Sequence, residues 1–332
     1  MINFFKNFFL PFEAKPLNNN PYTIESDLDL GFYKFGNKNP KKIFYVIRRT
    51  PGAGLFSNLI YVLNHLKIAD SNKFIPIVDM KNFITIYNEK KNVKKTKNAW
   101  EYYFVNNAKY NLLNVYKSEK VIITGNKFIK SFSHNISTNE FRVLFKKYFK
   151  IKKEFLQTAK KFSEKNFKNE KILAIHYRGT SYKTSANHPF PATTKQANEY
   201  INFLIKKYKY TKIFLCTEDL DFFYFMKKKF KNKILFLDTY RSLKDDSFRI
   251  YPRTFHRYKL GKEILIEALI MTYCNGFLHS KTNVSEFIKF IDRKKKINFF
   301  TLDNGFNSSN EYVARWLWYY KLFMPYNLGG FK

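Results

Sequence analysis

The chain has 332 residues, 45% of them hydrophobic and 20% aromatic, which is enough for the cores of roughly two domains. Its formal charge is +34, but only 10 of the 60 basic residues are arginine and the lysines are spread along the whole sequence, which disfavours a single nucleic-acid-binding arm. No apolar run approaches the ~18 residues that span a bilayer. The two cysteines, Cys216 and Cys274, lie in apolar runs and indicate a reducing compartment rather than a disulfide framework.

The amino-terminal run MINFFKNFFLPFEA contains a lysine and has no small-residue cleavage site, so it does not match a signal peptide. It fits either a short amphipathic segment in a membrane interface or a segment that packs onto the fold. After it, the pattern predicts a strand over 41–49, a helix over 57–69 with Ser57 as its N-cap, and a strand over 73–80. Residues 85–140 are less regular, and residues 139–168 are basic and amphipathic.

The second half alternates regularly between strands and helices. Strands are predicted at 171–178, 212–217, 233–238, 275–279 and 297–302. Helices are predicted between them, at about 195–208, 220–230, 261–274 and 283–292, and a final aromatic helix at 309–324. This alternation is typical of βαβ units and a parallel sheet. We therefore expect an α/β protein with two facing Rossmann-like domains, 1–168 and 169–306, and a C-terminal segment, 307–332, that packs back across them.

Polar side chains follow the predicted strands of the second half, where ligands bind in open α/β sheets. The strand ends present His176, Arg178, Gly179, Thr217, Asp219, Asp238, Thr282, Asn283 and Val284. These groups suit a nucleotide-sugar, because Arg178 can fork onto phosphate oxygens and the helix after Thr282 offers free N–H groups. Asp219 or Asp238 could accept hydrogen bonds from a purine or a ribose. Taken singly, Asp219 and Thr282 are also good helix N-caps and His176 a core histidine, so it is their convergence that indicates a site.

The first half contains PGAGLFSN, in which Gly52 and Gly54 resemble the start of a dinucleotide-binding loop, with Asp79 at the end of the next strand. This gives an alternative hypothesis, an NAD-type oxidoreductase, although Ser57 replaces the third glycine. A third hypothesis is a basic protein that binds nucleic acid or a membrane.

Several segments together resemble the fucosyltransferase superfamily of core alpha-1,6-fucosyltransferases, nodulation-type bacterial enzymes and protein O-fucosyltransferases. HYRGT (176–180) is similar to the family's H-x-R-[RG]-T, and FLCTED to a strand that ends in Thr-Asp-Asp. The resemblance extends over roughly 43–105 and 171–290. The other segments that carry it are PGAGLFSNLIYVLNHL (51–66), NAWEYYF (98–104), Asn187-His188-Pro189 and GKEILIEALIMTYCNGFLHSKTNVSEF (261–287).

The resemblance implies a GT-B-like fold and an inverting, metal-independent transfer from GDP-fucose, or a related GDP-sugar, to a cell-surface glycan in polysaccharide biosynthesis by a bacterial enzyme. No cofactor, metal or nucleic acid is expected. Arg178 would contact the β-phosphate and the glycosidic oxygen, and the other strand-end residues would bind the donor. On the cleft and acceptor side we place Gly52, Gly54, Asn58, Asp79, Glu101 and His188.

The sequence departs from the family where core-type enzymes carry charged groups. Gly179, Ser181 and Tyr182 replace those groups, and Ala186 stands near the place of a glutamate that is a candidate base. The general base is therefore unassigned, with Asp79 and Glu101 as candidates that could equally be a helix cap or a surface charge. We expect a cytoplasmic protein whose basic surface is compatible with peripheral attachment to the anionic inner face of the membrane.

Overall fold

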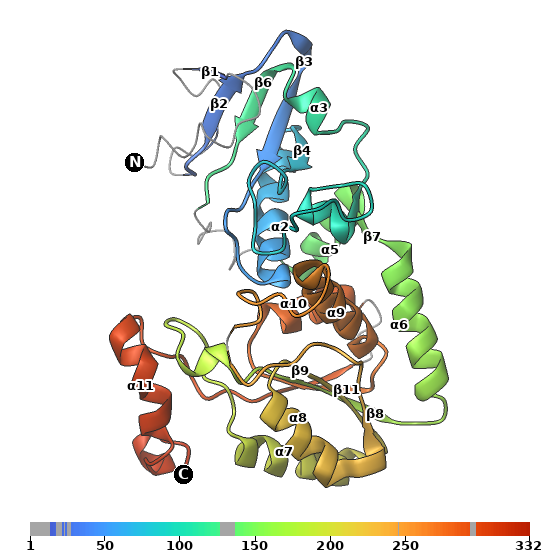
Figure 1. The fold of residues 1–332 in the computed structure, drawn as a ribbon, viewed down its shortest axis with the longest axis vertical. Helices are drawn as coiled ribbons and strands as arrows, with labels where there is room; N and C mark the ends of the chain where they lie inside the picture. Colours follow the sequence, from blue (N-terminus) through green and yellow to red (C-terminus); the bar gives the residue numbers. More distant parts are fainter. Residues whose placement is uncertain are drawn as a thin grey trace. The chain divides into compact units, whose positions relative to one another are not determined.

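The computed structural model describes residues 14–17, 22, 24, 28–126, 137–244, 246–292 and 297–332. The amino-terminal run at 1–13, assigned above to a membrane interface or to packing, lies outside them. The chain forms two compact units (Figure 1). The first unit is Met1–Lys153 with Arg253–Lys262, and the second is Glu154–Pro252 with Glu263–Lys332.

The first unit contains a mixed sheet with the strand order β1-β2-β6-β3-β4. Strand β3 pairs in parallel with both β6 and β4, whereas β2 is antiparallel to β1 and β6. The bounds are β1 Lys15–Pro16, β2 Gly31–Lys34, β3 Lys38–Ile47, β4 Ile75–Val78 and β6 Ser118–Ile123. The sequence predicted β3 and β4 but gave no strand at β2 or β6.

Helices α2 and α3 pack against this sheet, and β5 and β7 form a separate two-stranded antiparallel sheet. Their bounds are α2 Leu55–Ser71, η1 Ala99–Tyr102, β5 Phe104–Asn106, α3 Leu112–Val115, α5 Thr138–Tyr148 and β7 Phe149–Ile151. Helix α2 begins at Leu55 with Gly54 as its N-cap, so the prediction of Ser57 as N-cap was wrong. The Asn58 side chain closes the preceding loop on Ala53, which allows the helix to start earlier.

The second unit contains an all-parallel sheet with the order β10-β9-β8-β11-β12, which confirms the predicted parallel sheet. The strand bounds are β8 Ile172–Tyr177, β9 Lys212–Thr217, β10 Ile234–Leu235, β11 Gly276–His279 and β12 Asn298–Thr301. The helices are α6 Lys153–Asn166, η2 Ser181–Lys183, α7 Thr194–Tyr208, α8 Leu220–Phe230, η3 Lys231–Lys233, α9 His256–Met271, α10 Asn283–Ile291, α11 Glu311–Lys321 and η4 Tyr326–Leu328.

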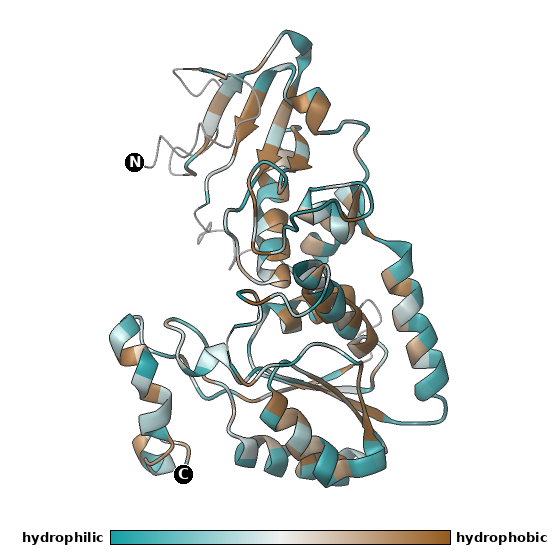
Figure 2. Cartoon of the chain, in the orientation of Figure 1, coloured by the Kyte–Doolittle hydropathy of each residue, from teal (hydrophilic) through white to brown (hydrophobic). Residues whose placement is uncertain are grey.

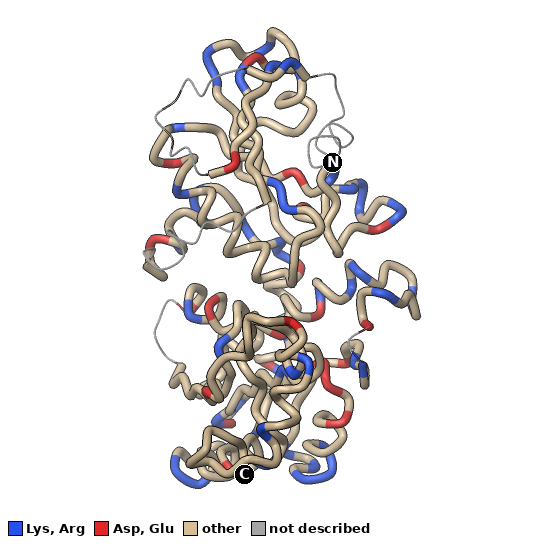
Figure 3. The backbone as a smooth tube through the Cα atoms, turned by 90° about the vertical axis from the view of Figure 1, so that its left-hand side faces the viewer, with Lys and Arg blue, Asp and Glu red and all other residues tan. Residues whose placement is uncertain are grey.

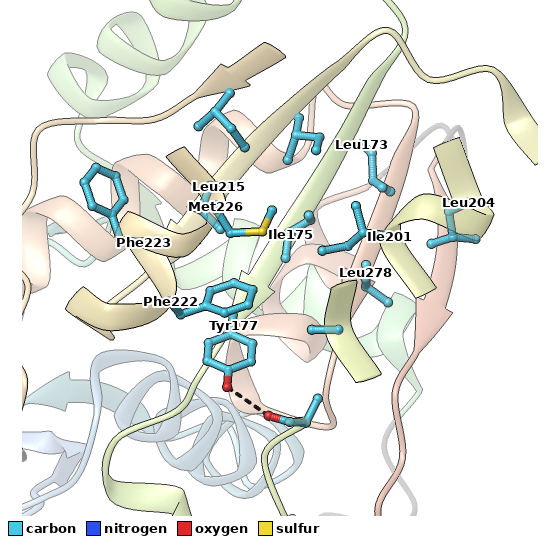
Figure 4. Packing of buried hydrophobic residues seen from close by; sticks show 14 of the residues in the cluster. Leu173, Ile175, Tyr177, Ile201, Leu204, Leu215, Phe222, Phe223, Met226 and Leu278 are labelled. Carbon is cyan, nitrogen blue, oxygen red and sulfur yellow. Dashed lines mark hydrogen bonds between the residues drawn. The ribbon is translucent and has the colours of Figure 1, made fainter. Parts of the chain in front are cut away.

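One face of the parallel sheet packs against α7 and α8. Figure 4 shows Leu173, Ile175 and Leu215 from the strands meeting Ile201 of α7 and Met226 of α8. At the end of β8 the Tyr177 ring stacks on the Phe222 ring, with centroids 3.6 Å apart, and the Tyr177 hydroxyl donates to the Ala192 carbonyl at 2.9 Å. This packing fixes the strand end from which the candidate site begins.

The opposite face of that sheet packs against α6 and α9. The Phe162 ring of α6 lies 5.5 Å from the Phe214 ring of β9 in an edge-on arrangement. Figure 2 shows α6 as mostly teal with isolated brown residues, the pattern of an amphipathic helix with one apolar side. Because Phe162 packs on β9, the compact units divide at Lys153 and Glu154, whereas the sequence placed the boundary at residue 168.

Lysine and arginine occur along the chain in both units (Figure 3). Within the described part of the chain, no helix is both long and apolar enough to cross a membrane.

Candidate functional site

The candidate site lies at the carboxyl edge of the parallel sheet in the second unit. Strand pairing sets His176 opposite Cys216 on one side and opposite His279 on the other, and Tyr177 opposite Thr217. The segments that follow β8, β9 and β11 therefore emerge at the same edge, as the sequence predicted from their strand ends.

Arg178 is the first residue after β8, and three neighbours hold its side chain. One of its terminal nitrogens donates to Ser181 Oγ at 3.1 Å. Its Nε lies 3.8 Å from Glu218 Oε1, and its guanidinium carbon lies 4.8 Å from the centre of the Tyr182 ring. The side chain nevertheless keeps 38% of its surface exposed. A positioned, accessible guanidinium of this kind can bind a phosphate group.

Glu218, at the end of β9, organises the loop that carries Arg178. Its Oε1 accepts hydrogen bonds from the Gly179 N–H at 3.2 Å, the Thr180 N–H at 3.4 Å and the Thr180 hydroxyl at 3.1 Å. The same oxygen is the one nearest to Arg178. A single carboxylate thus fixes both the backbone turn and the side chain.

Gly179 lies where any side chain would collide. A Cβ at this position would lie against Asp219 Oδ2 and 2.7 Å from the Tyr177 ring. The glycine is therefore required by close approach between the β8 and β9 loops.

Thr217 and Asp219 are used inside the turn that follows β9. Asp219 is the N-cap of α8 and accepts from the Phe222 N–H at 2.9 Å, while Thr217 Oγ1 accepts from the Asp219 N–H at 3.1 Å. The other Asp219 oxygen lies 3.8 Å from Lys183 Nζ. The interpretation of Asp219 as a helix cap is thus correct, and the Lys183 ammonium lies near the carboxylate oxygen that does not cap the helix.

Thr282, Asn283 and Val284 form the start of α10. Thr282 is its N-cap in a reciprocal capping box with Ser285, Asn283 is exposed, and Val284 is buried. The first N–H groups of a helix lack intrahelical acceptors, so this terminus offers donors next to β11.

Two buried histidines lie side by side below the edge. Burial, reinforced by the charge of Arg178 and by the neighbouring His279, lowers the pKa of His176 to about 3. Burial likewise lowers the pKa of His279, whose Nδ1 lies 2.9 Å from the Ser280 carbonyl. Both imidazoles are therefore neutral near pH 7. Within the described residues, His176 Nδ1 and His279 Nε2 are buried without a hydrogen-bond partner.

Cys216 continues this row toward α9, where Glu267 is buried. The Cys216 thiol donates to Glu267 Oε2 at 3.2 Å, and the Thr239 hydroxyl donates to the other oxygen at 3.4 Å. Burial raises the pKa of Glu267 to about 7, against smaller opposing effects that include the charge of Arg241.

Asp238 follows β10, which ends at Leu235 and not at 238 as predicted. The segment turns away because Arg241 donates to the carbonyls of Leu237 at 2.9 Å and Thr239 at 3.0 Å and lies over the Phe223 ring at 4.0 Å. Asp238 is exposed in this turn.

Most residues assigned to the acceptor side lie in the first unit. Gly52 has a φ of +74°, and Asn58 closes the Gly52–Gly54 loop through Ala53, accepting from its N–H at 2.9 Å and donating to its carbonyl at 3.0 Å. A Cβ on Gly54 would meet nothing within 4 Å.

The two candidate bases also lie in the first unit, where both are engaged. Asp79 is completely buried; it accepts from the Lys81 and Asn82 N–H groups at 3.0 and 2.9 Å and from the Tyr116 hydroxyl at 2.5 Å. Glu101 accepts from the Thr96 hydroxyl at 2.6 Å and the Asn98 amide at 3.2 Å. These are the contacts of structural carboxylates.

His188 lies in the second unit, close to Arg178. The centre of its ring is 4.8 Å from that of the Tyr182 ring, and the Arg178 guanidinium also contacts the Tyr182 ring. The His188 Nδ1 lies 2.7 Å from the Ala186 carbonyl. Arg178, Tyr182 and His188 therefore form one partly exposed group. In the described part of the chain, no group of three or more His, Cys, Asp or Glu could hold a metal ion.

Neither a protein-family model nor a curated protein matches the sequence, but solved structures match the fold. NodZ alpha-1,6-fucosyltransferase soaked with GDP-fucose aligns with a TM-score of 0.50 at 12% identity, over 75% of this chain and 92% of that chain. The same enzyme co-crystallized with GDP aligns with a TM-score of 0.50 at 13% identity, over 75% and 92%. POFUT1 in complex with GDP-fucose aligns with a TM-score of 0.45 at 11% identity, over 80% and 99%.

The chain shares its fold with NodZ. This confirms the predicted α/β, GT-B-like fold class.

Sequence reasoning selected Arg178 and Gly179 but assigned no role to Glu218, which contacts both, or to Lys183, which lies beside Asp219. Glu218 lies between Thr217 and Asp219 in the sequence, and Lys183 five positions after Arg178. Their roles depend on contacts with other loops, such as Glu218 with Gly179 and Lys183 with Asp219, which no local pattern encodes.

Proposed function

We propose that the chain is a glycosyltransferase that transfers fucose, or a related sugar, from a GDP-sugar to a cell-surface glycan acceptor. The observation that carries this proposal is the guanidinium of Arg178, which Ser181, Glu218 and Tyr182 hold in an accessible position at the carboxyl edge of a parallel sheet. The fold shared with NodZ, which has been crystallised with GDP and soaked with GDP-fucose, supports it.

In the proposed reaction an acceptor hydroxyl oxygen attacks the anomeric carbon while the bond from that carbon to the β-phosphate oxygen breaks, and the configuration inverts. The electron pair of the broken bond leaves with GDP, and the hydroxyl proton passes to a base. Arg178 would bind the diphosphate where negative charge grows. One preorganised donor of this kind contributes about 2.7–4 kcal/mol to lowering the barrier. Because a guanidinium supplies the positive charge, the proposal requires no metal.

Around Arg178 we propose a donor site built from the neighbouring strand ends. The α10 terminus at Thr282, Asn283 and Val284 would offer N–H groups to the diphosphate. His176, being neutral, could donate or accept a hydrogen bond without adding charge. Gly179 allows the loop to lie close to Asp219. We further propose that Thr217, Asp219 and Asp238 shape the nucleoside end of the site.

For the acceptor side we propose His188, beside Tyr182, together with the Gly52, Gly54 and Asn58 loop of the first unit. The hydrogen bonds of Asp79 and Glu101 weigh against either as the base, and they equally weigh against Asp79 as the ribose ligand of an NAD site. We propose polysaccharide biosynthesis in the cytoplasm, at the inner membrane face, as the setting.

Nucleotide binding separates this proposal from its alternatives. We expect GDP to raise the thermal unfolding midpoint in the presence of a chelator, and ADP, UDP and NAD to have smaller effects. Stabilisation by NAD and not by GDP would instead support the oxidoreductase, and steeply salt-dependent DNA binding without nucleotide affinity would support the nucleic-acid protein.

Arg178→Ala tests the catalytic role. We expect transfer from a GDP-sugar to fall by about 10²- to 10³-fold, with the midpoint of the nucleotide-free protein little changed, because Arg178 is partly exposed. Arg178→Lys should recover part of the activity, since lysine keeps the charge but loses the forked geometry. Arg315→Ala, an exposed arginine on α11, is the matched control. Transfer at the wild-type rate by Arg178→Ala would refute the assignment.

A further inference from the structure

Helix α11 presents aromatic side chains to solvent along one side. We call this set the aromatic face: Tyr312, Trp316, Tyr319, Tyr320 and Phe323. Tyr312, Trp316 and Phe323 are 78%, 73% and 77% exposed. Their spacing of three and four residues places Tyr312, Trp316, Tyr319 and Tyr320 on the same side of α11, and Phe323 follows in the turn after the helix ends at Lys321. Contiguous exposed aromatic surface of this kind is uncommon unless it meets a partner.

The opposite side of α11 accounts for how the helix is held on the second unit. Ala314 and Trp318 are buried there. The Trp318 indole N–H donates to the Pro191 carbonyl at 3.2 Å, and the Asn307 amide donates to the Ala314 carbonyl at 2.9 Å. The aromatic face is therefore not needed to dock the helix.

The residue types on the aromatic face favour a bilayer surface as its partner. Tyrosine and tryptophan have an apolar ring with one polar group at its edge, and they are enriched where hydrocarbon meets water at a bilayer surface. In a dry protein interface each buried hydroxyl and indole N–H would need its own partner, whereas lipid headgroups and water supply partners everywhere.

The charge around α11 has the sign that favours anionic lipid. From residue 305 to residue 332 the charged residues are Arg315, Lys321 and Lys332 against Glu311. The whole chain carries a formal charge of +34. Basic residues near an anionic surface add to the attraction between protein and bilayer.

We propose that the aromatic face of α11 binds the interfacial region of an anionic lipid bilayer. This inference does not depend on the proposed transferase activity. It would place the membrane one helix away from the candidate site, because the docked side of α11, opposite the aromatic face, packs on η2, which directly follows the Arg178 loop. There the Lys183 ammonium lies 5.2 Å from the centre of the Trp318 ring and 3.8 Å from Asp219 Oδ2.

The test is binding of the full chain to phosphatidylcholine vesicles with and without phosphatidylglycerol, measured by sedimentation at low and high salt. The test variant is Trp316→Ser/Tyr320→Ser/Phe323→Ser. The control, Phe203→Ser/Tyr224→Ser/Tyr273→Ser, removes exposed aromatic residues from elsewhere on the second unit. We expect wild type and control to bind the anionic vesicles, and the α11 variant to bind about tenfold more weakly or worse.

Equal vesicle binding by the α11 variant and the wild type would overturn the proposal. A second outcome would also overturn it: the wild type forms a dimer in the absence of vesicles, and the α11 substitutions dissociate this dimer but do not change vesicle binding. The aromatic face would then bind a second copy of the chain. Arg178→Ala should bind vesicles like the wild type, and the α11 variant should keep its transfer rate on a soluble acceptor. Failure of the membrane proposal is therefore distinguishable from failure of the proposed activity.

Discussion

Glu218 holds the candidate site together through a single oxygen. That oxygen binds the Gly179 and Thr180 backbone and lies beside Arg178, so the orientation of the cation depends on a residue 40 positions later in the chain. The motif at 176–180 predicts Arg178 as the cation of the site. It could not predict what orients that cation, because the sequence Thr-Glu-Asp does not show whether the glutamate faces solvent or another loop.

Gly179→Ala tests the close approach of the two loops. We expect a loss of about 1–3 kcal/mol of stability together with loss of transfer, because the new methyl group would collide with the Asp219 carboxylate and the Tyr177 ring. The measurements are urea unfolding and the transfer rate. For the unfolding measurement Gly54→Ala is the matched control, since its Cβ would meet nothing within 4 Å and its φ of −55° suits alanine. If both variants lost the same stability, steric contact at Gly179 would not be the cause.

Glu267 should make stability depend on pH. Its pKa is about 7 in the folded protein against 4.5 for an ordinary glutamate, so between these values the folded state holds a proton that the unfolded state has lost. Stability from this group is complete below about pH 4.5 and falls as the pH rises toward 7. His176, with a folded pKa of about 3, acts in the opposite sense and destabilises the fold as the pH falls below 6.5.

Glu267→Gln removes the first of these effects and leaves the second. Relative to wild type, the variant should gain about 2–3 kcal/mol of stability between about pH 5 and pH 8. Urea unfolding of both proteins across that range measures the difference. Parallel pH profiles would show that Glu267 does not keep its proton in the folded state.

At the scale of elements, the helix starts at the sheet edge have a capping role and a proposed binding role. Asp219 caps α8 and Thr282 caps α10, and both helices begin where we propose that the donor binds. Capping and ligand binding are often treated as competing interpretations of such residues. Here the cap uses one Asp219 oxygen, while the other faces Lys183.

Substitutions at Asp219 separate the two uses. Asp219→Asn keeps an oxygen that can accept from the Phe222 N–H, whereas Asp219→Ala removes it, so only the alanine variant should lose about 1 kcal/mol of stability. If Asp219 also binds the nucleoside, both variants should bind GDP more weakly. Calorimetric titration with GDP and thermal unfolding measure the two effects. Wild-type GDP affinity in the asparagine variant would leave Asp219 as a cap alone.

The sequence predicted elements well where apolar runs are flanked by polar turns, as for β8, β9 and α7. It missed β6, whose apolar part is only Val121, Ile122 and Ile123 after a polar start. It missed β2, Gly31–Lys34, whose residues are all half-buried and show no alternation. It overextended β10 because 233–238 contains an apolar run, whereas Arg241 draws the chain into a turn after Leu235. In each case tertiary contacts decided the outcome.

At the scale of the whole molecule, a late segment completes the first unit. Tyr258 lies in Arg253–Lys262, its N–H donates to Glu89 at 2.9 Å, and its carbonyl accepts from the Tyr103 hydroxyl at 3.1 Å. The Tyr258 ring stacks on that of Tyr103, with centroids 5.9 Å apart. The first unit is therefore built from two separate stretches of sequence.

Tyr258→Ala should weaken the first unit selectively, by about 3 kcal/mol, because it removes a buried aromatic ring. Hydrogen exchange should speed up in β3 and β6 and stay unchanged in β8 and β9. Tyr251→Ala, an exposed tyrosine just before the segment, is the control. Faster exchange across both sheets would mean that the units unfold as one.

Because Arg253–Lys262 belongs to the first unit, the order of synthesis determines when that unit can be completed. During synthesis the amino-terminal residues leave the ribosome first, and domains commonly fold in that order. Here the first unit lacks the partners of Tyr103 and Glu89 until Tyr258 has been translated. By then β8 and β9 of the second unit have already been made. The first unit can therefore be completed only after part of the second unit has been synthesised.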